Sequence, residues 1–277
     1  MLRLLQIEFI KLWNNKSSKF LILCYFGLLV SIALFASIKF NIGPIRFHLA
    51  EMGIFSFPYI WHFNTFIAAL FKLFLAIIIV SMVANEYSNK TLKQNLIDGL
   101  SKKEFILSKF LTVLAFSAIS TLFIFVVSLL LGLSFSDFNE VGIIFRDLEY
   151  LIAYFIKLVG FFSFCLFVGI LIKRSAFALG FLFMWFIIAE IFPYIYLMSK
   201  YSKEFADKVF AFSPFGSMWN LIAEPFTRLN AVKSIASQVG EEVNRDFAVH
   251  WYELLIVLGW TSIFIFLSYY LLKKRDL

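Results

Sequence analysis

Six long apolar stretches constrain this chain more than any other feature of its sequence. They lie at about 20–38, 63–84, 110–134, 150–172, 176–198 and 252–272. A helix of roughly 20 apolar residues crosses the hydrocarbon core of a bilayer, which is about 30 Å thick. The stretches are continuous rather than alternating, and backbone groups in lipid must pair within their own segment, so we expect helices rather than barrel strands. The predicted fold class is an all-α polytopic membrane protein with six transmembrane helices.

The composition excludes an ordinary soluble protein. Of the 277 residues, 61% are hydrophobic and 16% are charged, whereas soluble domains are about 45–50% apolar and about 25% charged. The first stretch does not fit a cleaved signal peptide, because its leader contains Glu8 and its apolar run exceeds the usual length of about 7–15 residues. Cys24 and Cys165 both fall inside predicted spans, where they indicate small apolar residues rather than a disulfide framework.

The distribution of charge predicts the orientation of the spans. Lysine and arginine outnumber acids in the segments on the side of the two termini, and acids outnumber bases on the opposite side. Because an excess of basic residues marks the cytoplasmic face, we expect both termini to be cytoplasmic. The net charge of +7 is then explained by topology and by contact with anionic membrane lipid, and no nucleic acid partner is expected.

The segments between the spans differ in character. Residues 1–19 suit an amphipathic helix lying in the membrane interface, with a short leader that only carries charge as the alternative. The extracytoplasmic region 199–251 contains an apolar stretch around Ser213 and Pro214 that is too short to span. We expect a re-entrant or interfacial helical hairpin there, before the last span.

The cytoplasmic loop 85–109 is the most informative connection. Asn89 is a suitable N-cap for a short helix over 90–98, and Gly99 supplies a left-handed stop. Ser101 and Glu104 have the spacing of a capping box that would begin a second helix. A short capped helix beneath the membrane suits docking into a groove of a soluble partner. The alternative is a loop whose charges merely hold it inside.

This loop resembles the permeases of bacterial ABC-2 type exporters. Glu86 is followed after three residues by Lys-Thr-Leu-Lys-Gln at 90–94, and then by Ser-x-x-Glu at 101–104 and by Ser-Lys at 108–109. The usual form in that family is Glu-x-x-x-Gly-Thr-Leu, so Lys90 stands where glycine is common. The six spans, the interfacial N-terminal helix and the Ser-Pro-Phe-Gly stretch at 213–216 are also similar.

The resemblance implies one transmembrane domain over residues 1–277, inserted in the bacterial inner membrane. It implies a homodimer, or a pair of related permeases, bound to two copies of a separate ABC ATPase subunit that holds the ATP and Mg²⁺. A coupling helix at about 91–98 would fit a cleft in that ATPase, with Glu86 at the hinge. The residues that the resemblance assigns to ATPase docking are Glu86, Thr91, Leu92, Lys93, Leu96 and Asp98.

Three ionisable residues lie within predicted spans, namely Lys72, Lys157 and Glu190. Such residues usually face the protein interior and have partners. We expect Glu190 to pair with Lys72 or Lys157, with outward snorkelling of the lysines as the alternative. The resemblance places the second and fifth spans along the substrate path. Pro193 should break or kink the outer end of the fifth span.

Catalysis by this chain is not expected. The sequence has no phosphate-binding loop of the form G-x-x-x-x-G-K-[ST] and no H-E-x-x-H motif. His48, His62 and His250 are too scattered for a metal site and are expected at the surface. No catalytic residue, metal or cofactor is therefore predicted on this chain. Two other functions stay open at this stage, a secondary transporter with its own ion site and a non-transporting membrane anchor or signalling subunit.

Overall fold

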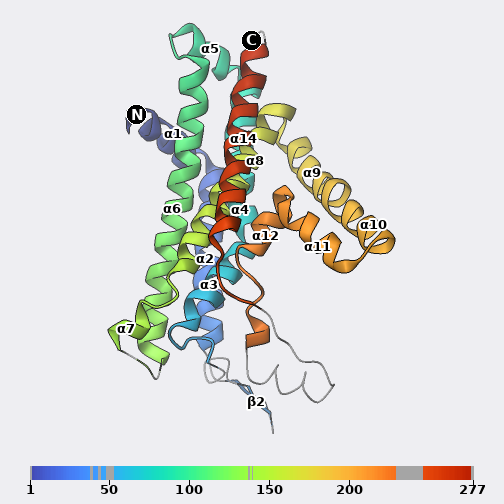
Figure 1. Ribbon diagram of the computed structural model, residues 1–277. Helices are drawn as coiled ribbons and strands as arrows, with labels where there is room; N and C mark the ends of the chain where they lie inside the picture. The colour runs from blue at the N-terminus through green and yellow to red at the C-terminus, as the bar shows by residue number, and fades with distance from the viewer. Residues whose placement is uncertain are drawn as a thin grey trace.

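The computed structural model describes residues 2–37, 40–42, 45–47, 53–136, 138, 140–228 and 246–275. Five helical segments are long and apolar enough to cross a membrane, and a bent pair of helices makes a sixth. The bounds of the straight spans are Lys16–Ser37 for α2, Lys102–Phe135 for α6, Glu149–Ile172 for α8 and Trp251–Lys274 for α14. The prediction of an all-α polytopic membrane protein is confirmed (Figure 1).

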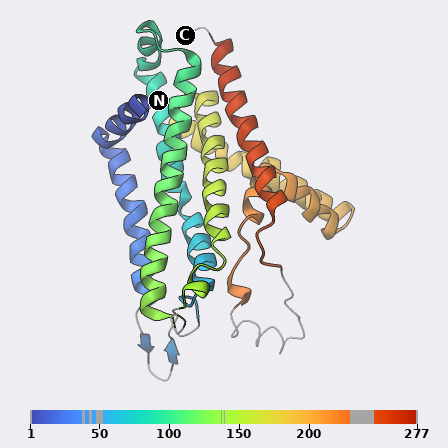
Figure 2. The same cartoon turned by 60° about the vertical axis from the view of Figure 1, so that its left-hand side comes forward.

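Helix α8 is the centre of the bundle. It packs against α14, α4, α6 and α9, and also against α3 and α12. Figures 1 and 2 show these helices around it from two sides. Its side chains Leu158, Phe162 and Leu166 are fully buried, which explains why this span is apolar on every side rather than on one stripe.

The second span is bent. It consists of α3 (Tyr59–Leu70) and α4 (Lys72–Ser88), which meet at an angle of 45°. Phe71 lies between them with φ −87° and ψ 0°, which is not a helical conformation. No proline or glycine occurs at this point. The sequence therefore predicted one straight span over 63–84 and missed the break at Phe71.

The fifth span diverges from the bundle and then returns through a helical hairpin (Figures 1 and 2). Its parts are α9 (Ser175–Trp185), the π-helix η2 (Phe186–Ile191) and α10 (Phe192–Lys200), followed by α11 (Lys203–Phe212) and α12 (Pro214–Asn220). Pro193 lies in the first turn of α10, where a proline needs no helical partner. The fifth span therefore continues beyond Pro193, and its irregular part, the π-helix η2, lies before Pro193. Helix α12 packs on α8 and α14, in agreement with the predicted re-entrant segment.

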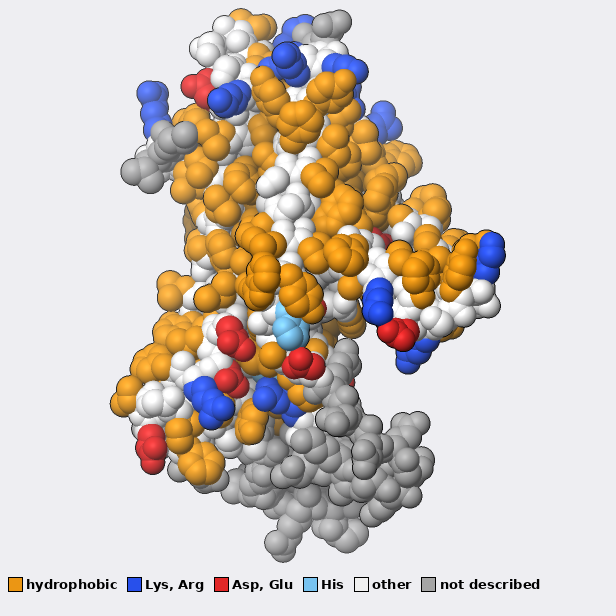
Figure 3. Space-filling model, viewed as in Figure 1, with side chains coloured by type: hydrophobic (Ala, Val, Ile, Leu, Met, Phe, Trp, Pro, Cys, Tyr) orange, Lys and Arg blue, Asp and Glu red, His pale blue; other side chains and the backbone are white. Residues whose placement is uncertain are grey.

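The two ends of the bundle carry different elements. Helix α1 (Leu2–Asn14) lies crosswise at one end, where α5 (Thr91–Ile97) and both termini are also found (Figure 1). Helix α7 (Val141–Ile144) and a two-stranded antiparallel hairpin lie at the other end. The hairpin pairs β1 (Phe40–Ile42) with β2 (Ile45–Phe47) in the register Phe40↔Phe47, and the 3₁₀ turn η3 (Phe226–Arg228) follows α12. Figure 3 shows hydrophobic side chains over the middle of the visible face and most charged ones toward its ends.

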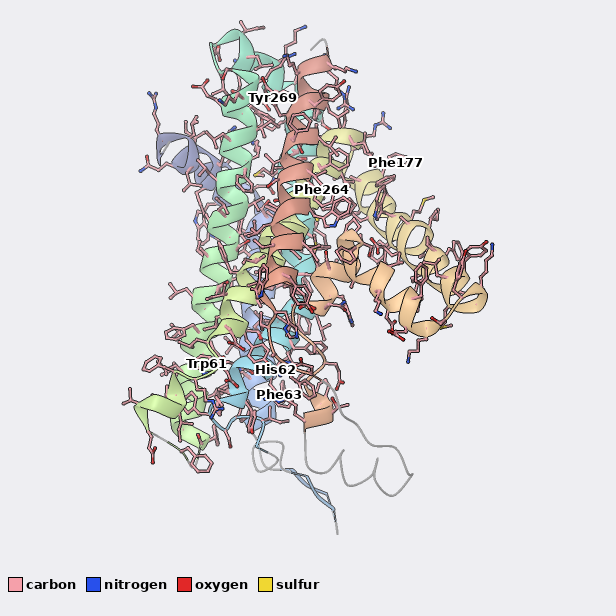
Figure 4. All side chains as sticks on the ribbon, in the orientation of Figure 1. Trp61, His62, Phe63, Phe177, Phe264 and Tyr269 are labelled. Atoms are coloured by element: carbon pink, nitrogen blue, oxygen red, sulfur yellow. The ribbon has the colours of Figure 1, made fainter. Side chains whose placement is uncertain are left out.

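One predicted surface histidine is buried. His62 on α3 is 0% exposed, its ring stacks on Tyr150 at 4.2 Å, and its Nε2 lies 2.8 Å from the carbonyl oxygen of Ala223. Figure 4 shows it beside Trp61 and Phe63 at the end remote from α5. The expectation was wrong for His62 because stacking and hydrogen bonds satisfy its ring in the interior. The side chain of His250 is 37% exposed, and His48 lies outside the described residues.

Candidate functional site

Four charged side chains meet beneath the spans, at the end of the bundle that carries α5. Glu8 and Lys11 come from α1, Glu86 from the last turns of α4 and Lys109 from the beginning of α6. Lys109 Nζ lies 2.6 Å from Glu8 Oε2 and 2.8 Å from Glu86 Oε1. Lys11 Nζ lies 2.9 Å from Glu86 Oε1 and 3.3 Å from Glu8 Oε1. We call these residues the four-charge cluster.

Three members of the four-charge cluster are buried, Lys11 is partly exposed, and the four charges balance. Lys109 is 0% exposed, and Glu8 and Glu86 are each 4% exposed. Two lysines and two glutamates neutralise one another, so no isolated charge is left in the interior. Partial burial disfavours the charged form of Lys11, but the hydrogen bond to Glu86 and the negative charges of Glu8 and Glu86 outweigh it and raise the pKa of Lys11. The cluster thereby clamps α1 onto α4 and α6.

Glu86 also holds the short helix α5. Its Oε2 accepts a hydrogen bond from Thr91 Oγ1 at 3.0 Å and one from Asn95 Nδ2 at 3.3 Å. Its Oε1 is bound by Lys11 and Lys109. One carboxylate therefore joins four helices, with α5 on one oxygen and α1 and α6 on the other. Glu86 lies at the junction of span and short helix, the position that the resemblance assigned to a hinge.

The exposed face of α5 differs from the one that the sequence suggested. Leu92 is 1% exposed and belongs to the hydrophobic core, and Leu96 packs against that core. Leu92 therefore holds α5 onto its own chain, and the partly buried Leu96 packs beside it. Ile97, in contrast, is 74% exposed. The outward face of α5 and of its C-terminal end is formed by Lys93, Gln94, Ile97 and Asp98.

Lys90 enters α5 in a left-handed conformation, with φ 57° and ψ 13°. This geometry costs an L-residue roughly 1–2 kcal/mol more than it costs glycine, which accounts for the glycine that is common at this position in the resembling family. Asn89 does not cap the helix, so that expectation was wrong. Gly99 has φ 100° and ends α5 as expected, and Ser101 and Glu104 form the predicted capping box at the start of α6.

Two lysines lie within the spans without a carboxylate partner. Lys72 is the first residue of α4, at the break of the second span, and its Nζ lies 4.4 Å from the centre of the Phe161 ring. Lys157 on α8 is 3% exposed, and its Nζ lies 5.9 Å from the centre of the Trp219 ring. The described residues provide no hydrogen bond or salt bridge to either ammonium group. A lysine at the centre of a membrane helix costs about 2.5–3.5 kcal/mol on insertion scales.

Glu190 does not form the predicted ion pair with Lys72 or Lys157 in the described structure. It lies in η2 and is 2% exposed. Its Oε1 accepts a hydrogen bond from the Phe215 backbone N–H at 3.1 Å, and its Oε2 accepts one from the Ser213 hydroxyl. Both donors belong to the first turn and N-cap of α12. The hairpin brings a helix N-terminus to the carboxylate, and no pattern in the sequence predicted this proximity. Glu190 therefore anchors the hairpin to the fifth span.

The sequence did not identify Glu8, Lys11 and Lys109 as site residues. One signal was present, because Glu8 is the only acid in residues 1–19 and Lys11 follows it by three positions. An acid that an interfacial helix buries is unfavourable unless its charge is paired, so Glu8 indicated a buried basic partner. Within the described part of the chain, no three His, Cys, Asp or Glu side chains cluster closely enough to hold a metal ion.

Comparison with known proteins supports the resemblance that the loop suggested. No curated protein matches the chain. The family model described as "ABC-2 family transporter protein" matches residues 13–277, which covers all the spans, α5 and the hairpin of α11 and α12. The match favours an ABC transporter permease over the two other functions that the sequence left open. The chain therefore belongs to the ABC-2 transporter family and is a multi-pass membrane component rather than a catalytic subunit.

Proposed function

We propose that the chain is the permease subunit of an ATP-driven exporter and that α5 docks onto a separate ABC ATPase. Two copies of that ATPase bind the ATP and Mg²⁺. A second permease protomer, identical or related, completes the path. The protein lies in a bacterial inner membrane with both termini in the cytoplasm. This orientation is supported by the basic residues around α5 and the termini, which share one end of the bundle (Figure 1).

The observation that carries the proposal is the exposed end of α5 together with its attachment to Glu86. Ile97 is an apolar side chain that is 74% exposed at the end of α5. An exposed apolar residue on a short helix is typical of an anchor that enters a groove of a partner. Lys93 and Asp98 provide charges of both signs beside it, which suit a polar rim.

The four-charge cluster explains how docking can affect the spans. Displacement of α5 pulls on Glu86 through Thr91 and Asn95. Glu86 in turn holds Lys109 of α6 and Lys11 of α1. The ATPase would therefore act on three elements at once, and its ATP-bound and ATP-free states would favour two arrangements of the paired permeases.

The expected docking residues change accordingly. Lys93 and Asp98 keep their expected role at the interface. Glu86 and Thr91 serve as the internal connection, and Leu92 and Leu96 hold α5 in place. The proposed path still includes the surface around Lys72, Lys157 and Glu190.

A pull-down from mildly solubilised membranes tests the docking face. We expect wild-type protein to recover an ATP-binding subunit and Ile97→Glu to lose it, because the anchor would carry a charge into an apolar groove. Val141→Glu is a matched control, since Val141 is 70% exposed on the short helix α7 at the opposite end. It should recover the subunit as wild type does.

The proposal fails if Ile97→Glu recovers the ATPase as well as wild type does, in cells that express their ABC ATPases. Recovery of no ATP-binding protein by the wild type would also contradict it. Size-exclusion chromatography must show that each variant is folded. Leu92→Asp is not used as the test, because Leu92 is buried and its replacement would disturb the core.

A further inference from the structure

The two intramembrane lysines share one location between three structural elements. Lys72 begins α4 and contacts Phe161 of α8, and Lys157 lies one helical turn before Phe161 on the same helix. Trp219 of α12 covers Lys157, and Phe215 of α12 also contacts Phe161 at 5.9 Å. Lys72 and Lys157 therefore both lie at the same part of α8, one at Phe161 and the other one turn before it. We call Lys72, Lys157 and these aromatic rings the lysine site.

The lysine site has cations and no counter-charge. Aromatic rings offer their faces to the ammonium groups, but a ring carries no net charge. Glu190 has a different set of partners, the Ser213 hydroxyl and the Phe215 N–H. Within the described residues, neither lysine has a hydrogen-bond acceptor, although Lys157 is only 3% exposed. Buried charges in membranes are usually paired, and an unpaired one marks a functional position.

The N-terminus of α4 lies at the same place, with one residue between it and the C-terminus of α3. Helix α4 is 17 residues long and begins at Lys72. No side chain caps its N-terminus, and no acid lies in its first turn. A helix N-terminus carries a partial positive charge, which in a capped helix is offset by an acid or a capping oxygen. Half-helix N-termini within membranes face anionic groups of substrates in other transporters.

We propose that the lysine site binds the anionic group of an amphipathic cargo, a phosphate or a carboxylate attached to an apolar chain. The anion would lie between Lys72 and Lys157, and the rings of Phe161, Phe215 and Trp219 would contact its apolar part. This inference rests on the proposed function, because it names the chemical class of what the permease moves.

The lysine site is partly accessible from the surface of the bundle. Trp219 is 51% exposed, and Lys72 is only half-buried. Movement of α12 away from α8 would uncover Lys157, and it would have to break the packing of α12 on α8 and α14 as well as the hydrogen bonds of Glu190 to the first turn of α12. The hairpin can serve as a cover whose position changes in the transport cycle.

Thermal unfolding of the full chain in a neutral sugar detergent tests the proposal. The probe is dodecyl phosphate, compared with dodecylphosphocholine, which has the same chain and phosphate but no net charge. We expect dodecyl phosphate to raise the unfolding temperature of the wild type, because it supplies the missing anion. Dodecylphosphocholine should produce a clearly smaller shift. Inorganic phosphate alone should produce none, since it lacks the apolar chain.

Variants locate the effect. Lys157→Met should lose the shift caused by dodecyl phosphate while unfolding at or above the wild-type temperature without the probe, because it removes an unpaired buried charge. Lys200→Met is the matched control, since the Lys200 ammonium also lies over an aromatic ring, 5.4 Å from the centre of Tyr196, but Lys200 is exposed. It should respond like the wild type. If Lys157→Met does not insert, Lys72→Met at the half-buried position provides the same test.

An equal shift in wild type and Lys157→Met would overturn the proposal, as would no shift in the wild type. An equal shift with inorganic phosphate would overturn the amphipathic part of the proposal. Recovery of the ATPase in the pull-down should be unchanged by Lys157→Met, which separates a failure of the cargo site from a failure of docking.

Discussion

Charge is buried in two regions of this permease, and the two regions are organised in opposite ways. The four-charge cluster contains two cations and two anions, with four ion-pair distances between 2.6 and 3.3 Å. The lysine site contains two cations surrounded by aromatic rings. Burying a balanced set mainly fixes geometry, whereas burying an unbalanced pair leaves electrostatic energy that a bound anion can relieve. The first arrangement suits a mechanical junction and the second a binding site.

The largest expected effect comes from unbalancing the cluster. Lys109→Met leaves Glu8 and Glu86 buried with only the partly exposed Lys11 to neutralise them. We expect a loss of about 3–5 kcal/mol in the free energy of unfolding, since removal of one partner leaves a buried charge unpaired. Chemical unfolding in mixed micelles measures it. The stability of Lys157→Met should change in the opposite direction, and a similar loss in both variants would remove the distinction between the regions.

A second variant controls for side-chain shape in that experiment. Adding Glu8→Gln to Lys109→Met removes one of the two carboxylates and restores charge balance. We expect the double variant to recover part of the lost stability. No recovery would mean that the packing of Lys109 matters and that its charge does not.

An intermediate effect is expected at Glu190, a buried carboxylate held by neutral donors. Glu190→Gln replaces one acceptor oxygen with an NH₂ group that faces the Ser213 hydroxyl or the Phe215 N–H. We expect a loss of about 1–3 kcal/mol, the cost of a buried polar group without a partner, and looser attachment of the hairpin of α11 and α12. Limited proteolysis of this hairpin checks the second effect. Glu253→Gln on α14 should have a smaller effect, and equal effects would contradict the anchoring role.

The smallest effect is expected at the capping box, where a carboxylate makes hydrogen bonds in contact with water. Ser101 accepts from the Glu104 N–H at 3.1 Å, and Glu104 accepts from the Ser101 N–H at 2.9 Å. Ser101→Ala should cost about 1 kcal/mol, the usual effect of losing an N-cap, and Ser101→Thr should be nearly neutral. If Ser101→Ala lowered the free energy of unfolding as much as Lys109→Met, burial would not explain why the capping box and the four-charge cluster differ.

The sequence predicted the spans and the local signals within the cytoplasmic loop. Apolar length determines a membrane helix, and the Ser101–Glu104 spacing and Gly99 act over a few residues, so no tertiary information was required. The burial of Leu92 was missed because an apolar residue on a short exposed helix can face either a partner or its own chain. The break at Phe71 was missed because no proline or glycine marks it in the sequence.

Pairing of distant charges was the other failure. Three charges within the spans suggested a pair, but a position within a span says nothing about which faces of the helices meet. Glu190 instead met the N-terminus of α12, whereas Glu8 met Lys109 across 101 positions of sequence. Each of these contacts depends on how helices rotate about their own axes, and the apolar pattern of a membrane span records that rotation poorly because lipid-facing and buried sides are both apolar.

The contact between Glu8 and Lys109 has a consequence for the order in which the protein is assembled. The ribosome makes residue 109 after 101 further residues have been added to Glu8, which takes about 5–20 s at 5–20 residues per second. During that interval Lys11 of the same helix is the cation at hand. Lys11 can pair with Glu86 once the second span is made, but α1 can be attached to α6 only after the third span has begun to form. The first residues synthesised are therefore among the later ones to reach their final position.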